Sequence, residues 1–172
     1  MSERRIPLLV AGLAVVAAAM AGYVFAGQND GPGNPQSSER HAEVAAKGQQ
    51  VMPFDLNRTT HQFTKSATGG VQSVTADDPA DTEQITLIRG HLTEAAAGFG
   101  HGDYGDPAAI HGTGMPGLRE LQQGHTRIEI RYAETPAGAQ ITYTSSDPSL
   151  VTALHTWFDA QVSDHGSHAE HG

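Results

Sequence analysis

Hydrophobic and polar positions alternate in two pairs of short segments along the chain. The first pair covers residues 59–65 and 71–76, with Gly69-Gly70 between its members. The second pair covers residues 128–132 and 139–144, with Pro136-Ala137-Gly138 between its members. A period of two residues is typical of strands with one buried face, and glycine or Pro-x-Gly between two such runs is typical of a turn. The pattern predicts two β-hairpins.

Each hairpin is followed by a segment in which apolar residues recur at helical spacing. Asp78-Pro79 and Asp147-Pro148 introduce these segments, and an aspartate followed by proline is typical of a helix start. The apolar positions are Ile85, Ile88, Leu92, Ala95 and Phe99 in the first segment, and Val151, Leu154, Phe158 and Val162 in the second. We therefore predict an α+β domain over residues 52–163, in which a ββα unit is used twice. Its four-stranded antiparallel sheet would carry two main helices on one face.

The N-terminus is apolar over a length that suits a membrane. Arg4 and Arg5 precede residues 6–26, which contain no charged side chain. About 20 apolar residues span the hydrocarbon core of a bilayer, and the two arginines favour an N-terminus that stays inside. Val24-Phe25-Ala26 also suits a signal-peptidase site. Residues 1–26 are thus expected to be a transmembrane anchor in the plasma membrane or a cleaved signal peptide. Both alternatives place the domain outside the cytoplasm, as a single-pass protein or as a secreted or periplasmic one.

Two segments around the predicted domain lack a strong apolar pattern. Residues 27–51 include the breaker-rich stretch 31–38, which predicts a flexible linker, with a short helix near residues 42–49 as an alternative. Residues 164–172 contain three histidines and two carboxylates among small residues, and we interpret them as a histidine-rich tail.

Charge and composition narrow the classes of partner. The formal net charge is −9, which argues against nucleic acid as a partner because phosphate binding needs clustered Lys and Arg. There is no cysteine, and this excludes disulfides and thiolate metal sites. Histidines are as numerous as Lys and Arg together, with ten of each. The sequence does not indicate a protein partner.

The tail is the first candidate metal site. His165, His168 and His171 follow one another at three-residue spacing. Neutral imidazole is a ligand for copper and zinc, and glycines in the tail would let several rings converge on one ion. The alternative is a polar tail that is rich in histidine without a function.

Two internal sets are further candidates. His101, His111 and Met115 lie in a glycine-rich loop, where a thioether together with imidazoles would favour copper. His61, His91 and His155 share strand or helix faces with apolar residues, so packing is one interpretation of them. If these three converged, they would form a copper-type or catalytic-type site.

No common enzyme motif is present. The sequence lacks a Gly-x-Ser-x-Gly elbow, a Walker loop, a dinucleotide fingerprint and a His-Glu-x-x-His motif. The leading hypothesis is an extracytoplasmic metal-binding protein that buffers or delivers copper or zinc through histidine ligands. The alternative is a non-catalytic envelope domain that binds a protein or a small ligand and carries incidental histidines. An enzyme is the third hypothesis.

A family resemblance covers the predicted domain. The residues that carry it are Met52-Pro53-Phe54-Asp55-Leu56, Thr60-His61-Gln62-Phe63, Ala108-Ala109-Ile110-His111-Gly112, Met115-Pro116-Gly117-Leu118 and Leu154-His155-Thr156-Trp157-Phe158. In these stretches the chain resembles small, exported actinobacterial proteins that are often labelled aspartate carbamoyltransferase. The Ser-Thr-Arg-Thr carbamoyl-phosphate loop of that enzyme is absent from this sequence. The resemblance therefore implies a domain that begins near Met52, and it transfers no catalytic residue.

Overall fold

The computed structural model describes residues 35–172, nearly all of the compact unit Gly31–Gly172. The predicted membrane segment at residues 6–26 and the first part of the predicted linker, residues 27–34, lie outside the described residues. Across residues 35–172, no helix has the length and apolar character needed to cross a membrane.

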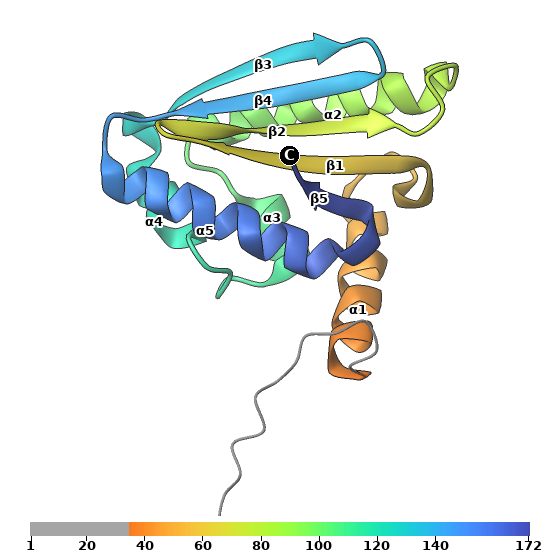
Figure 1. Cartoon of the computed structure of the whole chain (residues 1–172), viewed down its shortest axis with the longest axis horizontal. Helices are drawn as coiled ribbons and strands as arrows, with labels where there is room; N and C mark the ends of the chain where they lie inside the picture. Colours follow the sequence, from red (N-terminus) through yellow and green to blue (C-terminus); the bar gives the residue numbers. More distant parts are fainter. Residues whose placement is uncertain (1–34) are drawn as a thin grey trace, which may run out of the picture. The chain divides into compact units, whose positions relative to one another are not determined.

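The described chain forms a mixed sheet of five strands, which confirms the two predicted hairpins (Figure 1). Strands β1 (Thr59–Ser66) and β2 (Gly69–Ala76) form the first hairpin, and β3 (Glu129–Thr135) and β4 (Gly138–Thr144) form the second. The strand order is β3-β4-β2-β1-β5. The first four strands pair in antiparallel fashion, whereas β5 (Ala169–His171) is parallel to β1.

Within residues 35–172, five α-helices complete the α+β fold. They are α1 (Pro35–Val51), α2 (Thr82–Gly100), α3 (Gly105–His111), α4 (Leu118–Gly124) and α5 (Pro148–His165). Short 3-10 turns cover Leu56–Arg58, His125–Arg127 and Gly166–His168. Asp147 caps α5 as predicted, since its side chain accepts a hydrogen bond from the Ser149 backbone N–H. Helix α2 begins later than predicted, because Asp81 rather than Asp78 supplies the cap.

The core lies between the helices and one face of the sheet. Alternate residues of β1 and β4 are buried, and across the sheet His61 pairs with the buried Val74, which pairs in turn with the buried Ala139. Helix α2 packs on β2, β3 and β4, and α5 packs on β1, β2 and β5. The ring of Phe63 lies 5.1 Å from that of Phe158 on α5. The other face of the sheet carries polar side chains that are partly or fully exposed.

The fifth strand is absent from our prediction of a four-stranded antiparallel sheet. The tail is ordered: α5 continues to His165, and Ala169–His171 pairs with residues 61–63 of β1. Backbone pairing explains this difference. An edge strand exposes N–H and C=O groups, and the tail covers those of β1 while Ala169 becomes buried.

Residues 35–51 also differ from the predicted flexible linker. They form α1, which packs against α3 and α5. Val44 is fully buried on this helix, and the Arg40 guanidinium donates hydrogen bonds to the Asp164 carboxylate and to the His111 carbonyl oxygen. The helix is thus attached to the domain by the buried Val44, by the charged contacts of Arg40 and by a contact between His41 Nε2 and the Ser163 carbonyl oxygen, although its sequence is mostly polar.

Candidate site: a histidine-lined cavity

A cavity of about 150 Å³ opens between β1 and helices α2, α3 and α5. Buried side chains form its deep end, and exposed or half-buried residues form its mouth. The deep end comprises His61, Phe63, Leu92, Phe99, Ile110, His111, Trp157, Gln161 and His165. The mouth comprises His91, Glu94, Asp103, Gly105 and Asp106.

His61 lies at the deep end because β1 directs it to the helical side of the sheet. Its residue exposure is 3%, and its Nδ1 atom has no hydrogen-bond partner in the described part of the chain. The Phe54 ring lies 5.8 Å away. Burial lowers the pKa of His61 to about 4, with a further contribution from His91, while a hydrogen bond with the His168 backbone partly opposes this change. The imidazole is therefore neutral at physiological pH.

His165 is the last residue of α5 and stacks on His61. The two ring centroids are 5.2 Å apart, and the ring planes are inclined by 9°. Burial, together with the neighbouring His61 and His111, lowers the pKa of His165 to about 2. This imidazole is also neutral at physiological pH.

His111, at the end of α3, completes a group of three imidazoles. Its ring centroid lies 5.0 Å from that of His165. Its Nδ1 atom is 2.8 Å from Asp164 Oδ2, and Arg40 approaches the same oxygen at 2.5 Å. Burial lowers the pKa of His111, although Asp164 partly opposes this effect. Burial alone would raise the pKa of Asp164, but the hydrogen bonds from Arg40 and His111 bring it below its usual value.

This hydrogen-bond pattern orients His111. A neutral imidazole next to a carboxylate carries its proton on the nitrogen that faces the carboxylate, here Nδ1, and it leaves Nε2 with a free lone pair. Metal-ligating histidines often have a carboxylate partner of this kind.

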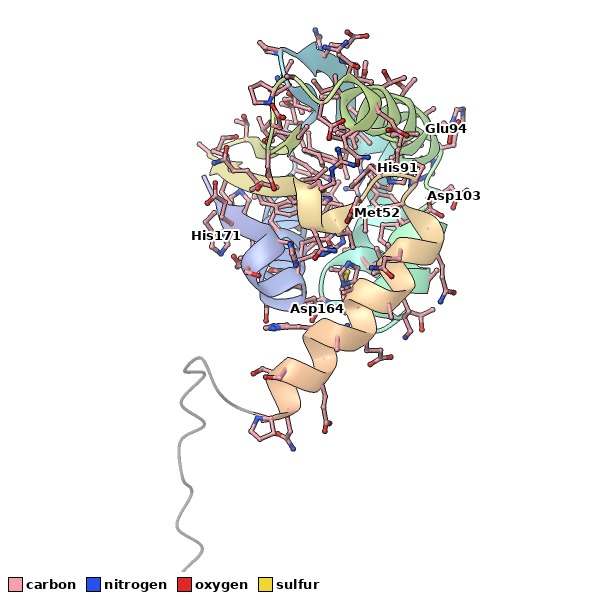
Figure 2. All side chains as sticks on the ribbon, turned by 90° about the vertical axis from the view of Figure 1, so that its right-hand side faces the viewer. Met52, His91, Glu94, Asp103, Asp164 and His171 are labelled. Carbon is pink, nitrogen blue, oxygen red and sulfur yellow. The ribbon has the colours of Figure 1, made fainter. Side chains whose placement is uncertain are left out.

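The mouth of the cavity is acidic. Figure 2 shows Met52, His91, Glu94 and Asp103 gathered on one side of the molecule. His91 is half-buried, and its ring lies 5.6 Å from that of Phe54. Burial lowers the pKa of His91, and the negative charges of Asp106 and Glu94 partly oppose this effect. Negative charge around an opening attracts cations toward it.

Three histidines that the sequence analysis assigned to three different candidate sets lie together in the structure. His61, His111 and His165 come respectively from the strand-and-helix set, the loop set and the tail. His91 joins them at the mouth. His168 reaches His61 through its backbone, and its side chain is half-buried.

The remaining predicted ligands lie elsewhere. His155 Nε2 is 2.8 Å from the carbonyl oxygen of Gly69, so it ties α5 to the first hairpin turn. His101 is exposed and contacts the Ala97 carbonyl oxygen. Met115 is buried outside this cavity, and His171 is exposed near Asp159. The predicted set of His101, His111 and Met115 is therefore not assembled, and neither is the tail set.

Three polar residues of the site were not among the predicted ligands. Gln161 is 5% exposed and lies close enough to His111 to raise the pKa of that ring, while its Oε1 atom forms no hydrogen bond of normal geometry within the described chain. Asp164 and Arg40 hold His111. A helical signal was present for two of them, since Gln161, Asp164 and His165 recur at i, i+3 and i+4 on one face of α5.

The rings of His61, His111 and His165 are close together, but their nitrogen atoms do not point at one common position. Between residues 35 and 172, no group of three or more His, Asp or Glu side chains has the geometry to hold an ion. The near-parallel planes of His61 and His165 mean that the rings would have to turn to direct nitrogens at one point.

Comparison of the chain with protein-family models, with curated proteins and with solved structures found no match.

Proposed function

We propose that this protein binds a copper or zinc ion outside the cytoplasm, for buffering or delivery, through the imidazoles of His61, His111 and His165. One observation carries this proposal: three buried imidazoles from three separate elements meet in ring-to-ring contact at the deep end of one cavity. Borderline metal ions such as Cu and Zn prefer imidazole nitrogen among the ligands available here.

The protonation states support the proposal. A metal ion binds the neutral imidazole and must displace any proton. Burial lowers the pKa of all three histidines, so their lone pairs are free at physiological pH. The Asp164 carboxylate orients His111 and increases the basicity of its Nε2 atom.

The entrance and one wall also suit a soft cation. Glu94, Asp103 and Asp106 surround the mouth with negative charge, and His91 lines the same mouth. The thioether of Met52 lines the same cavity, whereas Met115, the methionine suggested by the sequence, does not. A thioether beside imidazoles favours copper, especially Cu(I), over zinc.

Reorganisation sets an upper limit on the affinity. Because the His61 and His165 rings stack, binding must break this contact and turn at least one ring. The free energy of that change reduces the affinity relative to a preformed site. We expect a dissociation constant suited to buffering or transfer rather than to permanent structural binding. The apolar segment at residues 6–26 supports the extracytoplasmic location.

The test is a calorimetric titration of residues 31–172, the compact unit, with Cu(II), Zn(II) and, under reducing conditions, Cu(I). Three variants are compared with the unaltered unit. His111→Asn removes a proposed ligand, His101→Asn removes an exposed histidine outside the cavity, and the double variant His168→Asn/His171→Asn tests the tail. Substitution is preferable to truncation for the tail, because truncation would remove β5 from the sheet.

We expect one equivalent of metal to bind the unit, the His101 variant and the tail double variant alike. The His111 variant should bind at least tenfold more weakly. If His111→Asn binds like the unaltered unit, the cavity is not the site. If only the tail variant loses binding, the metal is held by the surface histidines alone, and the proposal fails.

A further inference from the structure

We infer that the deep end of the cavity also binds a small, uncharged organic amide that carries one ring. The inference starts from three polar atoms that have no partner in the described chain: His61 Nδ1, Trp157 Nε1 and Gln161 Oε1. All three residues line the same cavity, and they are 3%, 0% and 5% exposed. A buried polar atom without a partner destabilises a fold, so whatever occupies this space must supply the missing hydrogen bonds.

The other walls of the deep end are apolar. Phe63, Leu92, Phe99 and Ile110 line it, and each is at most 5% exposed. The volume of about 150 Å³ matches that of an engineered apolar protein cavity known to bind benzene. One six-membered ring therefore fits the apolar part, with room for a small polar substituent near Trp157 and Gln161.

The unpaired atoms specify the substituent. The Trp157 indole N–H only donates, and Gln161 Oε1 only accepts. A primary amide presents a carbonyl oxygen to the first and an N–H to the second, so it can satisfy both at once. The other ring nitrogen of His61 bonds to the His168 backbone, so the unpaired Nδ1 atom can accept a hydrogen bond from the second amide N–H.

Charge excludes the close analogues of an amide. Glu94, Asp103 and Asp106 surround the mouth with negative charge and repel a carboxylate. An ammonium group would have to leave water for a site without a carboxylate at its deep end, which is costly. An uncharged ligand avoids both penalties.

This inference does not depend on the proposed metal site. It shares His61 with that site, but Trp157 and Gln161 are not proposed ligands, and it is tested in the presence of a chelator. Amide binding without metal binding would leave it standing, and metal binding without amide binding would overturn it alone.

Trp157 is the only tryptophan in the chain, so its emission reports on the cavity directly. The experiment titrates the full-length protein, in mild detergent with EDTA, with benzamide, benzoate and toluene. These probes share a ring and differ in the substituent. We expect benzamide to change the emission in a saturable way, toluene to bind at least tenfold more weakly, and benzoate to have no saturable effect.

Three results would overturn the inference. The absence of saturation with every probe would mean that the cavity holds solvent only. Equal affinity for benzamide and toluene would mean an apolar cavity without amide recognition. Tighter binding of benzoate would mean an anion site.

A variant pair tests the role of Gln161. Gln161→Met keeps an unbranched side chain of similar length and removes the unpaired acceptor. We expect benzamide affinity to fall at least tenfold while the Tm of the free protein rises by several degrees, because an unpaired polar atom has left the core. Gln123→Met on exposed helix surface is the control, and it should change neither quantity. A lower Tm with unchanged benzamide affinity would make Gln161 a structural residue and contradict the inference. The ligand series on the unaltered chain decides the matter even if Gln161→Met does not fold.

Discussion

The two halves of the sheet bury different chemistry against the helices. Strand β4 presents Ala139, Ile141 and Tyr143 to the core, and α2 covers this half with Ile85 and Ile88. Strand β1 presents His61 beside Phe63, and the end of α5 covers it with Gln161 and His165. The first half is an ordinary apolar core. The second half contains three imidazoles and an amide where apolar side chains of similar size would have packed at lower cost.

This difference indicates where function lies. A fold that only needed stability would favour apolar residues at His61, Gln161 and His165, because buried polar groups without partners destabilise it. Groups with strongly shifted pKa values in a cleft are typical of functional sites. The apolar half thus stabilises the fold enough to tolerate the destabilising buried polar groups of the histidine half.

The largest expected effect is that of acid on the histidine half. The folded-state pKa values of His61 and His165 are lowered to about 4 and about 2, whereas in the unfolded chain they are near 6.5. Above pH 6.5 both states are neutral, and no stability is lost. Below it the unfolded chain takes up protons that the folded chain refuses, so the free energy of unfolding falls as the pH falls. Between pH 7 and 4, each ring should cost on the order of 3 kcal/mol.

Urea unfolding in EDTA at several pH values measures this loss. His61→Phe removes one of the proton sites and should reduce the slope between pH 6 and 4.5 by about 1.4 kcal/mol per pH unit. His101→Asn, in which an exposed histidine is replaced, should leave the profile unchanged. If His61→Phe and the unaltered protein have the same slope, His61 is protonated in the folded state, and the contrast between the two halves is wrong.

The second prediction concerns the apolar half. Ile88 is fully buried on α2, and Ile88→Ala removes methyl and methylene groups from a packed core. We expect the free energy of unfolding to fall by about 2–5 kcal/mol at pH 7.5, with little change in its pH dependence. Thr93→Ala, at an exposed position of the same helix, should change it by less than about 0.5 kcal/mol. A loss in Ile88→Ala no larger than that in the control would show that this half is not the source of stability.

The sequence predicts the two halves unequally well, and for a physical reason. Residues 128–132 and 139–144 alternate cleanly, and 82–100 has a helical period, so local pattern identifies these strands and helix α2. The tail strand Ala169–His171 has no such pattern, because it is held by backbone hydrogen bonds to β1 and by one buried alanine. Helix α1 is likewise held by Arg40 and Val44 rather than by an apolar stripe.

The candidate site, too, could be predicted only where local sequence determines it. His61, His111 and His165 were each candidate ligands, but the sequence placed them in three different sets. Their meeting depends on how β1, α3 and α5 pack, and no spacing along the chain encodes that packing. Only the part that lies within one helix was open to prediction: the recurrence of Gln161, Asp164 and His165 on one face of α5.

The smallest expected effect on stability is that of changing Asp164, which lies beside the histidine cluster. This carboxylate joins α5 to Arg40 of α1 and to His111 of α3. Asp164→Asn keeps the shape of the side chain and removes its charge, which weakens the hydrogen bonds from both partners. We expect the free energy of unfolding to fall by about 1.5–3 kcal/mol, the range for hydrogen bonds to a charged group. Hydrogen exchange should show earlier exposure of α1 than of α2, because Arg40 of α1 loses its charged partner while α2 keeps its buried apolar residues. Asp159→Asn is the matched control on the same helix: its partner Lys65 lies on the surface, and such pairs contribute less than about 1 kcal/mol. If Asp164→Asn is as mild as Asp159→Asn and α1 stays protected, Arg40 and Asp164 do not hold α1, and the orientation of His111 must come from packing alone.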